Sequence, residues 1–205
     1  MNRPVDALPP GLEQLIEQLV ERKVEERLGL VTEKLEAITA RLADAERRGV
    51  SDRATIVVFS GEMDLLMSAF IIATGAVTMG LEASMYFTFW GLNALRKDKT
   101  FAGKPASAKM IAAMLPSSVE RLPTSRMNMM GIGPAFFRSV MAKNNVESLP
   151  GLIAVARELG VKLIACEMAM GVMGITREEL LDDLEYGGVA TYLGDATDSR
   201  LTLFI

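Results

Sequence analysis

The sequence has no histidine and only one cysteine, and these two absences exclude several kinds of chemistry. Without histidine, a Ser-His-Asp triad, a Cys-His dyad and a histidine-ligated metal site cannot form. With Cys166 alone, one chain can make neither an internal disulfide nor a CxxC redox pair. A lone thiol is typical of the reducing cytosol, so we expect a cytoplasmic protein.

Charge and hydropathy set further limits. The chain carries 22 Lys and Arg against 26 Asp and Glu, and it does not show the basic face typical of nucleic-acid binders. Residues 1–10 lack the apolar stretch of a signal peptide. Between Leu65 and Leu95 the only charged residue is Glu82, a length that raises the question of a membrane span. We predict a buried helix followed by a buried strand there, and expect neither a membrane nor a nucleic acid as partner.

The chain is predicted to divide near residue 50. Residues 1–50 hold 8 basic and 10 acidic side chains, about twice the charge density of residues 51–205, which hold 14 and 16. Apolar residues in the first part follow alternating steps of four and three: Val24, Leu28, Val31, Leu35, Ile38, Leu42 and Ala45. This spacing predicts an N-terminal coiled-coil helix over residues 1–50.

A helix with such a stripe cannot bury it alone in water. We therefore predict that the helix joins helices of other copies, with packing on its own domain as the alternative. The number of helices that join is left open.

Residues 51–205 predict an α/β domain with a parallel sheet. Apolar runs typical of buried strands occur at residues 54–59, 83–89, 161–166 and 201–205, and helical patterns occur at 63–79, 127–143, 148–159 and 189–196. A first strand that is apolar on both faces, followed by a helix and a second strand, is typical of a sheet wound by helices. Residues 97–125 are the least regular, and we interpret them as an insertion or lid.

Cys166 ends one of the predicted strands and is the main candidate for a functional residue. Ligands of open α/β sheets bind at the carboxyl ends of the strands. Backbone amides at the start of the following helix would stabilise a thiolate, although a nearby Glu167 carboxylate would oppose it. The alternative is a buried, inert cysteine that only packs, which is common for free cysteines.

Two other features could line the same crevice. Ser60 and Gly61 follow the first strand, where backbone amides could hold an anion, although an ordinary turn explains them as well. Met168 and Met170 belong to a set of 14 methionines, whose thioethers could bind Cu(I). Methionine more often fills irregular cores, so no metal is expected.

Several segments together resemble the DsrE/DsrF/DsrH-like family, in particular its longer DsrE-like branch, which is often labelled peroxiredoxin family protein. The matching segments are residues 57–61, the Phe-Trp-Gly-Leu-Asn-Ala-Leu run within 87–95, residues 127–129, 166–175 and 186–192. The resemblance covers nearly all of residues 54–205. It implies a flavodoxin-like three-layer fold, a homo-oligomer and sulfur-transfer chemistry.

The same resemblance implies roles for individual residues. The family's conserved cysteine corresponds to Cys166, which would hold a persulfide, need no cofactor and exchange sulfur with small sulfur-carrier proteins and rhodanese-like enzymes. The residues predicted to bind substrate around it are Ser60, Gly61, Trp90, Asn93, Met168 and Met170. Some relatives carry a second cysteine that this chain lacks, which favours a one-thiol carrier or sulfurtransferase. The alternative function is an oligomeric binding or scaffold protein whose cysteine is structural.

Overall fold

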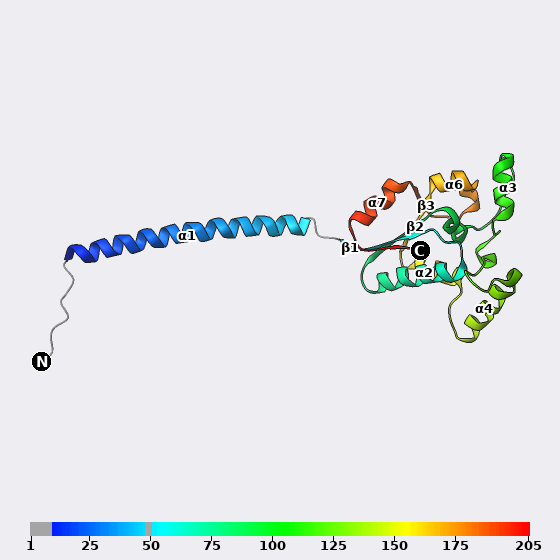
Figure 1. Cartoon of the computed structure of the whole chain (residues 1–205), viewed down its shortest axis with the longest axis horizontal. Helices are drawn as coiled ribbons and strands as arrows, with labels where there is room; N and C mark the ends of the chain where they lie inside the picture. The colour runs from blue at the N-terminus through cyan, green and yellow to red at the C-terminus, as the bar shows by residue number, and fades with distance from the viewer. Residues whose placement is uncertain (1–9, 48–50) are drawn as a thin grey trace. The chain divides into compact units, whose positions relative to one another are not determined.

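The computed structural model describes residues 10–47 and 51–205, and it divides the chain into the units Met1–Gly49 and Val50–Ile205. The first unit contains one long helix, α1 (Pro10–Arg47; Figure 1). Every described side chain of α1 between residues 11 and 42 is exposed, including the apolar heptad residues. The predicted helix is therefore present, whereas its pairing into a coiled coil stays a prediction.

The second unit is built on a five-stranded sheet in which all strands are parallel. The strands are β1 (Ser51–Val58), β2 (Glu82–Phe87), β3 (Lys162–Cys166), β4 (Glu185–Gly187) and β5 (Ser199–Phe204). Their spatial order is β5-β1-β2-β3-β4. The predicted flavodoxin-like α/β class is confirmed, with β1 lying between β2 and the last strand, β5.

Helices cover both faces of this sheet. The α-helices are α2 (Met63–Thr78), α3 (Ala106–Met114), α4 (Ile132–Lys143), α5 (Leu149–Glu158), α6 (Glu167–Met173) and α7 (Val189–Thr197). The short 3-10 helices are η1 (Phe89–Leu95), η2 (Val119–Arg121), η3 (Met129–Gly131) and η4 (Arg177–Glu179). Figure 1 shows α2 on one side of the sheet and α6 and α7 on the other, and α5 packs beside α2.

The direction of strand order explains where α2, α5 and α7 lie. From β1 through β3 the chain advances in one direction, and right-handed crossovers place α2 and α5 on the same face. From β4 the chain returns across the sheet to β5, and the same handedness places α7 on the opposite face. The result is the three-layer arrangement that the sequence predicts.

The face toward α2 is apolar and closely packed. Ile56, Val58 and Phe87 alternate along β1 and β2 and are fully buried. Phe70 of α2 packs on Phe87 with ring centroids 5.8 Å apart. This layer contributes the hydrophobic free energy that holds the sheet.

The apolar stretch from Leu65 to Leu95 is divided among α2, β2 and η1. Across the residues that the structure describes, no helix combines the length and the hydropathy needed to cross a membrane. The predicted sequence of buried helix and buried strand is what the structure shows.

The insertion is more regular than its composition predicts. Residues 97–125 contain both α3 and η2. The helix predicted from residue 127 begins only at Ile132, because Met127 and Met129 have positive φ angles of 58° and 39° and turn the chain. Gly133 then lies so close to the Met127 carbonyl that a side chain has no room there.

A buried carboxylate fixes the start of the insertion. Glu179 binds the guanidinium of Arg96 at 2.7 Å, and all three side chains of Glu179, Arg96 and Lys104 are buried. Glu179 also accepts hydrogen bonds from Lys104 and from the backbone amide of Thr100. Burial on its own would raise the pKa of Glu179, but these donors outweigh it and hold that pKa below its usual value.

Candidate functional site

Cys166 lies where β3 ends and α6 begins. It is the N-cap residue of α6, and its Sγ accepts a hydrogen bond from the backbone N–H of Ala169 at 3.5 Å. The positive end of this N–H dipole points toward the sulfur, and this orientation favours the anionic form of a sulfur atom. The predicted arrangement of strand end, cysteine and helix start is therefore present.

Tyr86 approaches the same sulfur from the neighbouring strand. It pairs in register with Ile164, and because side chains alternate along a strand, Tyr86, Ile164 and Cys166 share one face of the sheet. Burial and a hydrogen bond with Cys166 hold the pKa of Tyr86 well above its usual value. The phenol therefore stays protonated and can donate to the sulfur.

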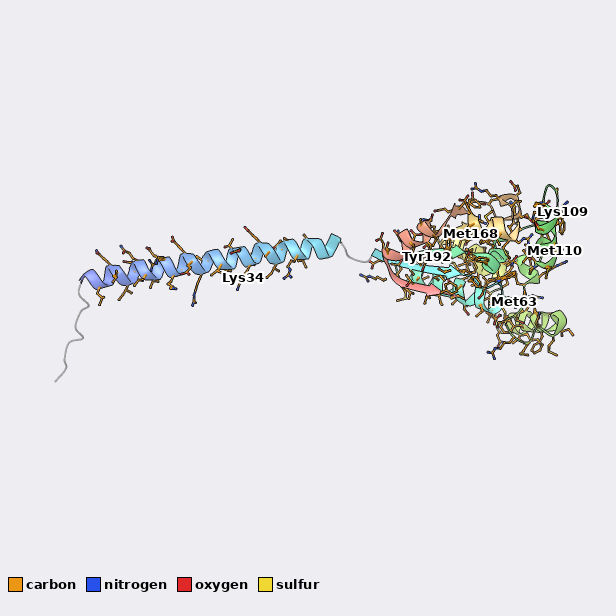
Figure 2. All side chains as sticks on the ribbon, turned by 45° about the horizontal axis from the view of Figure 1, so that its top comes forward. Lys34, Met63, Lys109, Met110, Met168 and Tyr192 are labelled. Atoms are coloured by element: carbon orange, nitrogen blue, oxygen red, sulfur yellow. The ribbon has the colours of Figure 1, made fainter. Side chains whose placement is uncertain are left out.

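A second aromatic ring backs this tyrosine. Tyr192 of α7 lies with its ring centroid 5.6 Å from that of Tyr86. Figure 2 marks Tyr192 on α7 and Met168 on α6, the two helices that cover this face. Neither tyrosine was predicted as a site residue, because the register that brings Tyr86 beside Cys166 is not visible in the sequence.

Glu167, the residue after the cysteine, has a partner of its own. Its carboxylate lies 2.5 Å from the guanidinium of Arg177, which also stacks over the ring of Tyr186 at 4.2 Å from the centroid. The negative charge next to the thiol is therefore paired with a cation. The opposition to a thiolate that the sequence raises is reduced accordingly.

The thiol itself is covered, since Cys166 is only 2% exposed. The α6 helix packs against α3 of the insertion, where a side chain at Gly174 would collide with Ala108. Gly174 also has a positive φ of 64°. The start of the insertion is held by Glu179, and the role of the insertion as a lid stays a prediction.

The structure brings Gly61, Trp90 and Asn93 together beside this region. A side chain at Gly61 would come within 3.0 Å of the Trp90 carbonyl, so glycine allows the close approach. Asn93 is buried and donates from Nδ2 to the same carbonyl at 3.0 Å, while its Oδ1 has no partner among the described residues. These residues belong to or contact η1, which packs against β3 and α6.

Three backbone amides near Ser60 are used within the chain. Phe59 and Ser60 donate their N–H groups to the Ile205 carbonyl, and Met63 donates to the Pro123 carbonyl. This arrangement matches the ordinary turn that the sequence allowed and leaves these amides paired.

The two predicted methionines differ in their surroundings. Met168 is 59% exposed on α6, and Met170 is buried in the core. Trp90 is 48% exposed, whereas Ser60 and Gly61 are half-buried. Whether any of them binds a substrate stays a prediction.

Comparison with known proteins supports the resemblance seen in the sequence. The model of the DsrE/DsrF/DrsH-like family matches residues 50–204. The chain belongs to this family. It is 47% identical over 154 residues to the uncharacterized protein YrkE of Bacillus subtilis (strain 168), covering 75% of this chain and 96% of YrkE.

A second family member has a functional name. The chain is 27% identical over 157 residues to the sulfur carrier protein DsrE2 of Allochromatium vinosum, covering 75% of this chain and 98% of DsrE2. Among solved structures, the ychN protein from E. coli aligns at 11% identity with a TM-score of 0.43, covering 75% of this chain and 99% of ychN. The family match begins at residue 50, so α1 lies outside it.

Proposed function

We propose that this chain is a sulfur carrier that holds a persulfide on Cys166 and passes its outer sulfur to partner proteins. Membership of the DsrE/DsrF/DrsH-like family, and a relative named as a sulfur carrier, support a sulfur-relay role. The observation that carries the assignment to Cys166 is its place at the N-cap of α6, where the Ala169 amide donates to its sulfur and Tyr86 occupies the same face of the sheet.

The transfer needs no oxidant and no second cysteine. The Cys166 thiolate attacks the outer sulfur of a donor persulfide, R–S–SH, and a new S–S bond forms as the donor S–S bond breaks. The donor leaves as the thiolate R–S⁻, and the proton of the original persulfide stays with the transferred sulfur or passes to solvent. Delivery repeats the same displacement with an acceptor thiolate, so the oxidation state of the system is unchanged.

Tyr86 is the positioning residue in this proposal. Its protonated phenol donates to the sulfur, and the tilted contact with the ring of Tyr192 holds the phenol in place. A hydrogen bond to an anionic sulfur stabilises the thiolate before attack and the departing thiolate after delivery.

Because Cys166 is 2% exposed, loading and delivery require its cover to open. In our proposal the part of the insertion that includes α3 acts as this lid, since it rests on α6 through Ala108 and Gly174. The exposed side chains of Trp90 and Met168 are then the surface that a small sulfur-carrier protein or a rhodanese-like enzyme would contact.

Self-association completes the proposal. The exposed heptad stripe of α1 is expected to join copies of the chain in the cytoplasm. The family match covers the α/β unit alone, so α1 adds an assembly function to the carrier.

One observation favours a second candidate function. A cysteine that is almost fully buried is also what a structural residue would show, and the protein would then be an oligomeric binding or scaffold protein. In that case Cys166→Ala leaves function intact, and the native thiol resists alkylation.

The deciding experiment is intact-protein mass spectrometry after incubation with inorganic polysulfide. A carrier gains one sulfur atom, a shift of about 32 Da that a reductant removes. Cys166→Ala should show no shift, and Tyr192→Phe, which keeps the aromatic stack, should load like the native protein. Absence of loading on native protein, with the thiol still titratable after unfolding, would establish the structural alternative.

A further inference from the structure

The exposed stripe of α1 has a definite heptad register. Leu28 and Val31 are three residues apart, as are Leu35 and Ile38, and four residues separate each pair from the next. In a heptad labelled a to g, this spacing places leucine at a and a β-branched residue at d, and Leu42 continues the a positions.

This placement bears on how many helices pack together. Parallel two-stranded coiled coils favour β-branched residues at a and leucine at d, and the reverse assignment favours three or four strands. The chain has the reverse assignment in the two heptads that begin at Leu28 and Leu35, and Val24 gives the preceding d position a β-branched residue too, whereas the d position after Leu42 is Ala45.

The flanking positions differ in charge. The g positions carry the cations Arg27, Lys34 and Arg41, all of them exposed, and Figure 2 shows Lys34 projecting from the helix. The e positions between them are Thr32 and Thr39, whose hydroxyls donate to backbone carbonyls one turn earlier, at 2.9 and 2.7 Å. Glu25 and Glu46 occupy the e positions before and after these threonines, so one flank is basic and the other is neutral to acidic.

These flanks distinguish the two possible orientations. In an antiparallel pair, g positions face g positions, so the cations of one helix would face the cations of the next. In a parallel arrangement each g position faces an e position of its neighbour, and Lys34 meets a threonine instead. Like charges at short range disfavour the antiparallel arrangement.

We propose that α1 assembles three or four copies of this chain into a parallel coiled coil over residues 24–42. Each assembly then carries three or four α/β units, all of which follow the same end of the bundle, and as many Cys166 thiols. The inference rests on the self-association proposed above and adds to it the number and direction of the helices.

Direction is tested by crosslinking in the full-length Cys166→Ala background. Val24→Cys at a d position should form disulfide-linked chains on mild oxidation, because a parallel register brings this residue to its own copies. Glu26→Cys, on the outward side of the same turn, is the matched control and should link at least tenfold more slowly. Linkage only in a mixture of Val24→Cys with Leu42→Cys chains would show an antiparallel pair and overturn the proposed direction.

Number is tested by light scattering on the full chain. The native protein should have the mass of three or four chains, or a multiple of it. A quadruple variant of unchanged composition, L28V/V31L/L35I/I38L, should lower the number of chains joined through α1 to two. Leu35→Asp should abolish this association, whereas Ala37→Asp, on the outer side of α1, should keep it.

The outcomes separate this inference from the proposed function. A native mass of two chains overturns the number, and a mass unchanged by Leu35→Asp overturns α1 as the interface. Sulfur loading of Cys166 is measured independently, so the carrier function can fail or hold whatever the assembly does.

Discussion

The two faces of the sheet are built from different chemistry on the same strands. Toward α2, β1 and β2 present Ile56 and Phe87 in a dry aliphatic and aromatic layer. Toward α7, the same strands present Thr55, Ser84 and Tyr86. Hydroxyls and charges near the strand starts give way to tyrosine and cysteine near the strand ends. The comparison teaches that one layer supplies stability and leaves the other free to hold reactive groups.

The largest effect should come from the apolar face. Phe70→Ala removes a fully buried ring that packs on Phe87, and we expect a loss of about 3–5 kcal/mol in the free energy of unfolding. Urea denaturation measures it. Ile71→Ala, on the exposed side of the same helix, should cost about 0.5 kcal/mol. Equal costs at the two positions would contradict the assignment of stability to this layer.

A polar cluster away from the sheet should show that burial of charge alone does not make a reactive site. Glu179→Gln leaves Arg96 and Lys104 buried beside a neutral amide, and we expect a loss of about 3–5 kcal/mol at pH 7. Sulfur loading of Cys166 should be unchanged. If Glu179→Gln is as stable as the native protein, or if it folds but does not load sulfur, the cluster is not a purely stabilising feature separate from the Cys166 site.

The same residue gives a pH dependence with a definite sign. The folded pKa of Glu179 lies below the usual value of 4.5, so its stabilising contribution is fully present above pH 4.5. It is lost as the pH falls below that value through the folded pKa. The free energies of unfolding of the native protein and of Glu179→Gln should therefore converge below pH 4.5. A difference between them that persists or widens at lower pH would show that the ionised carboxylate is not the source of the stabilisation.

An intermediate effect is expected where the polar face meets Cys166. Tyr86→Phe keeps the ring against Tyr192 but removes the phenol donor, so stability should fall by about 1 kcal/mol. Alkylation of the native thiol should slow by roughly tenfold at neutral pH, because the reacting sulfur loses a hydrogen-bond donor. Tyr192→Phe is the control and should leave both unchanged. An unaltered rate in Tyr86→Phe would show that the phenol only packs.

The smallest effect on the thiol should come from the hydrogen-bonded hydroxyl groups at the other end of that face. Thr55 lies 3.0 Å from the hydroxyl of Ser84 and 2.7 Å from that of Ser199. Thr55→Val should cost about 1 kcal/mol in the free energy of unfolding and leave thiol alkylation unaffected. A change in alkylation would mean that the two ends of the face are coupled.

Much of the fold could be predicted because it follows from local patterns. Apolar runs such as residues 54–59 predict buried parallel strands, and the end of the run at Cys166 predicts where β3 meets a helix. The edge strand β4 was missed, since Glu185, Tyr186 and Gly187 are too few and too polar to give such a pattern.

The parts of the site that were missed depend on contacts between distant segments. Tyr86 reaches Cys166 only through the register of β2 on β3, and Glu179 reaches Arg96 and Lys104 across 83 and 75 residues of sequence. No spacing rule connects such positions. Alternation along the strand could have shown which face Tyr86 occupies, but not which residue it meets.

The almost complete burial of Cys166 has a kinetic consequence for the proposed carrier. When opening is rare and closing is fast, small thiols in the cell reach the loaded sulfur only while the cover is open. The lifetime of the persulfide therefore increases in inverse proportion to the fraction of time that the cover is open. A partner protein that binds the open form and stabilises it reacts with the sulfur without this slowing. Selectivity for the correct recipient would then arise from control over the frequency of opening, with no change in the intrinsic reactivity of the sulfur.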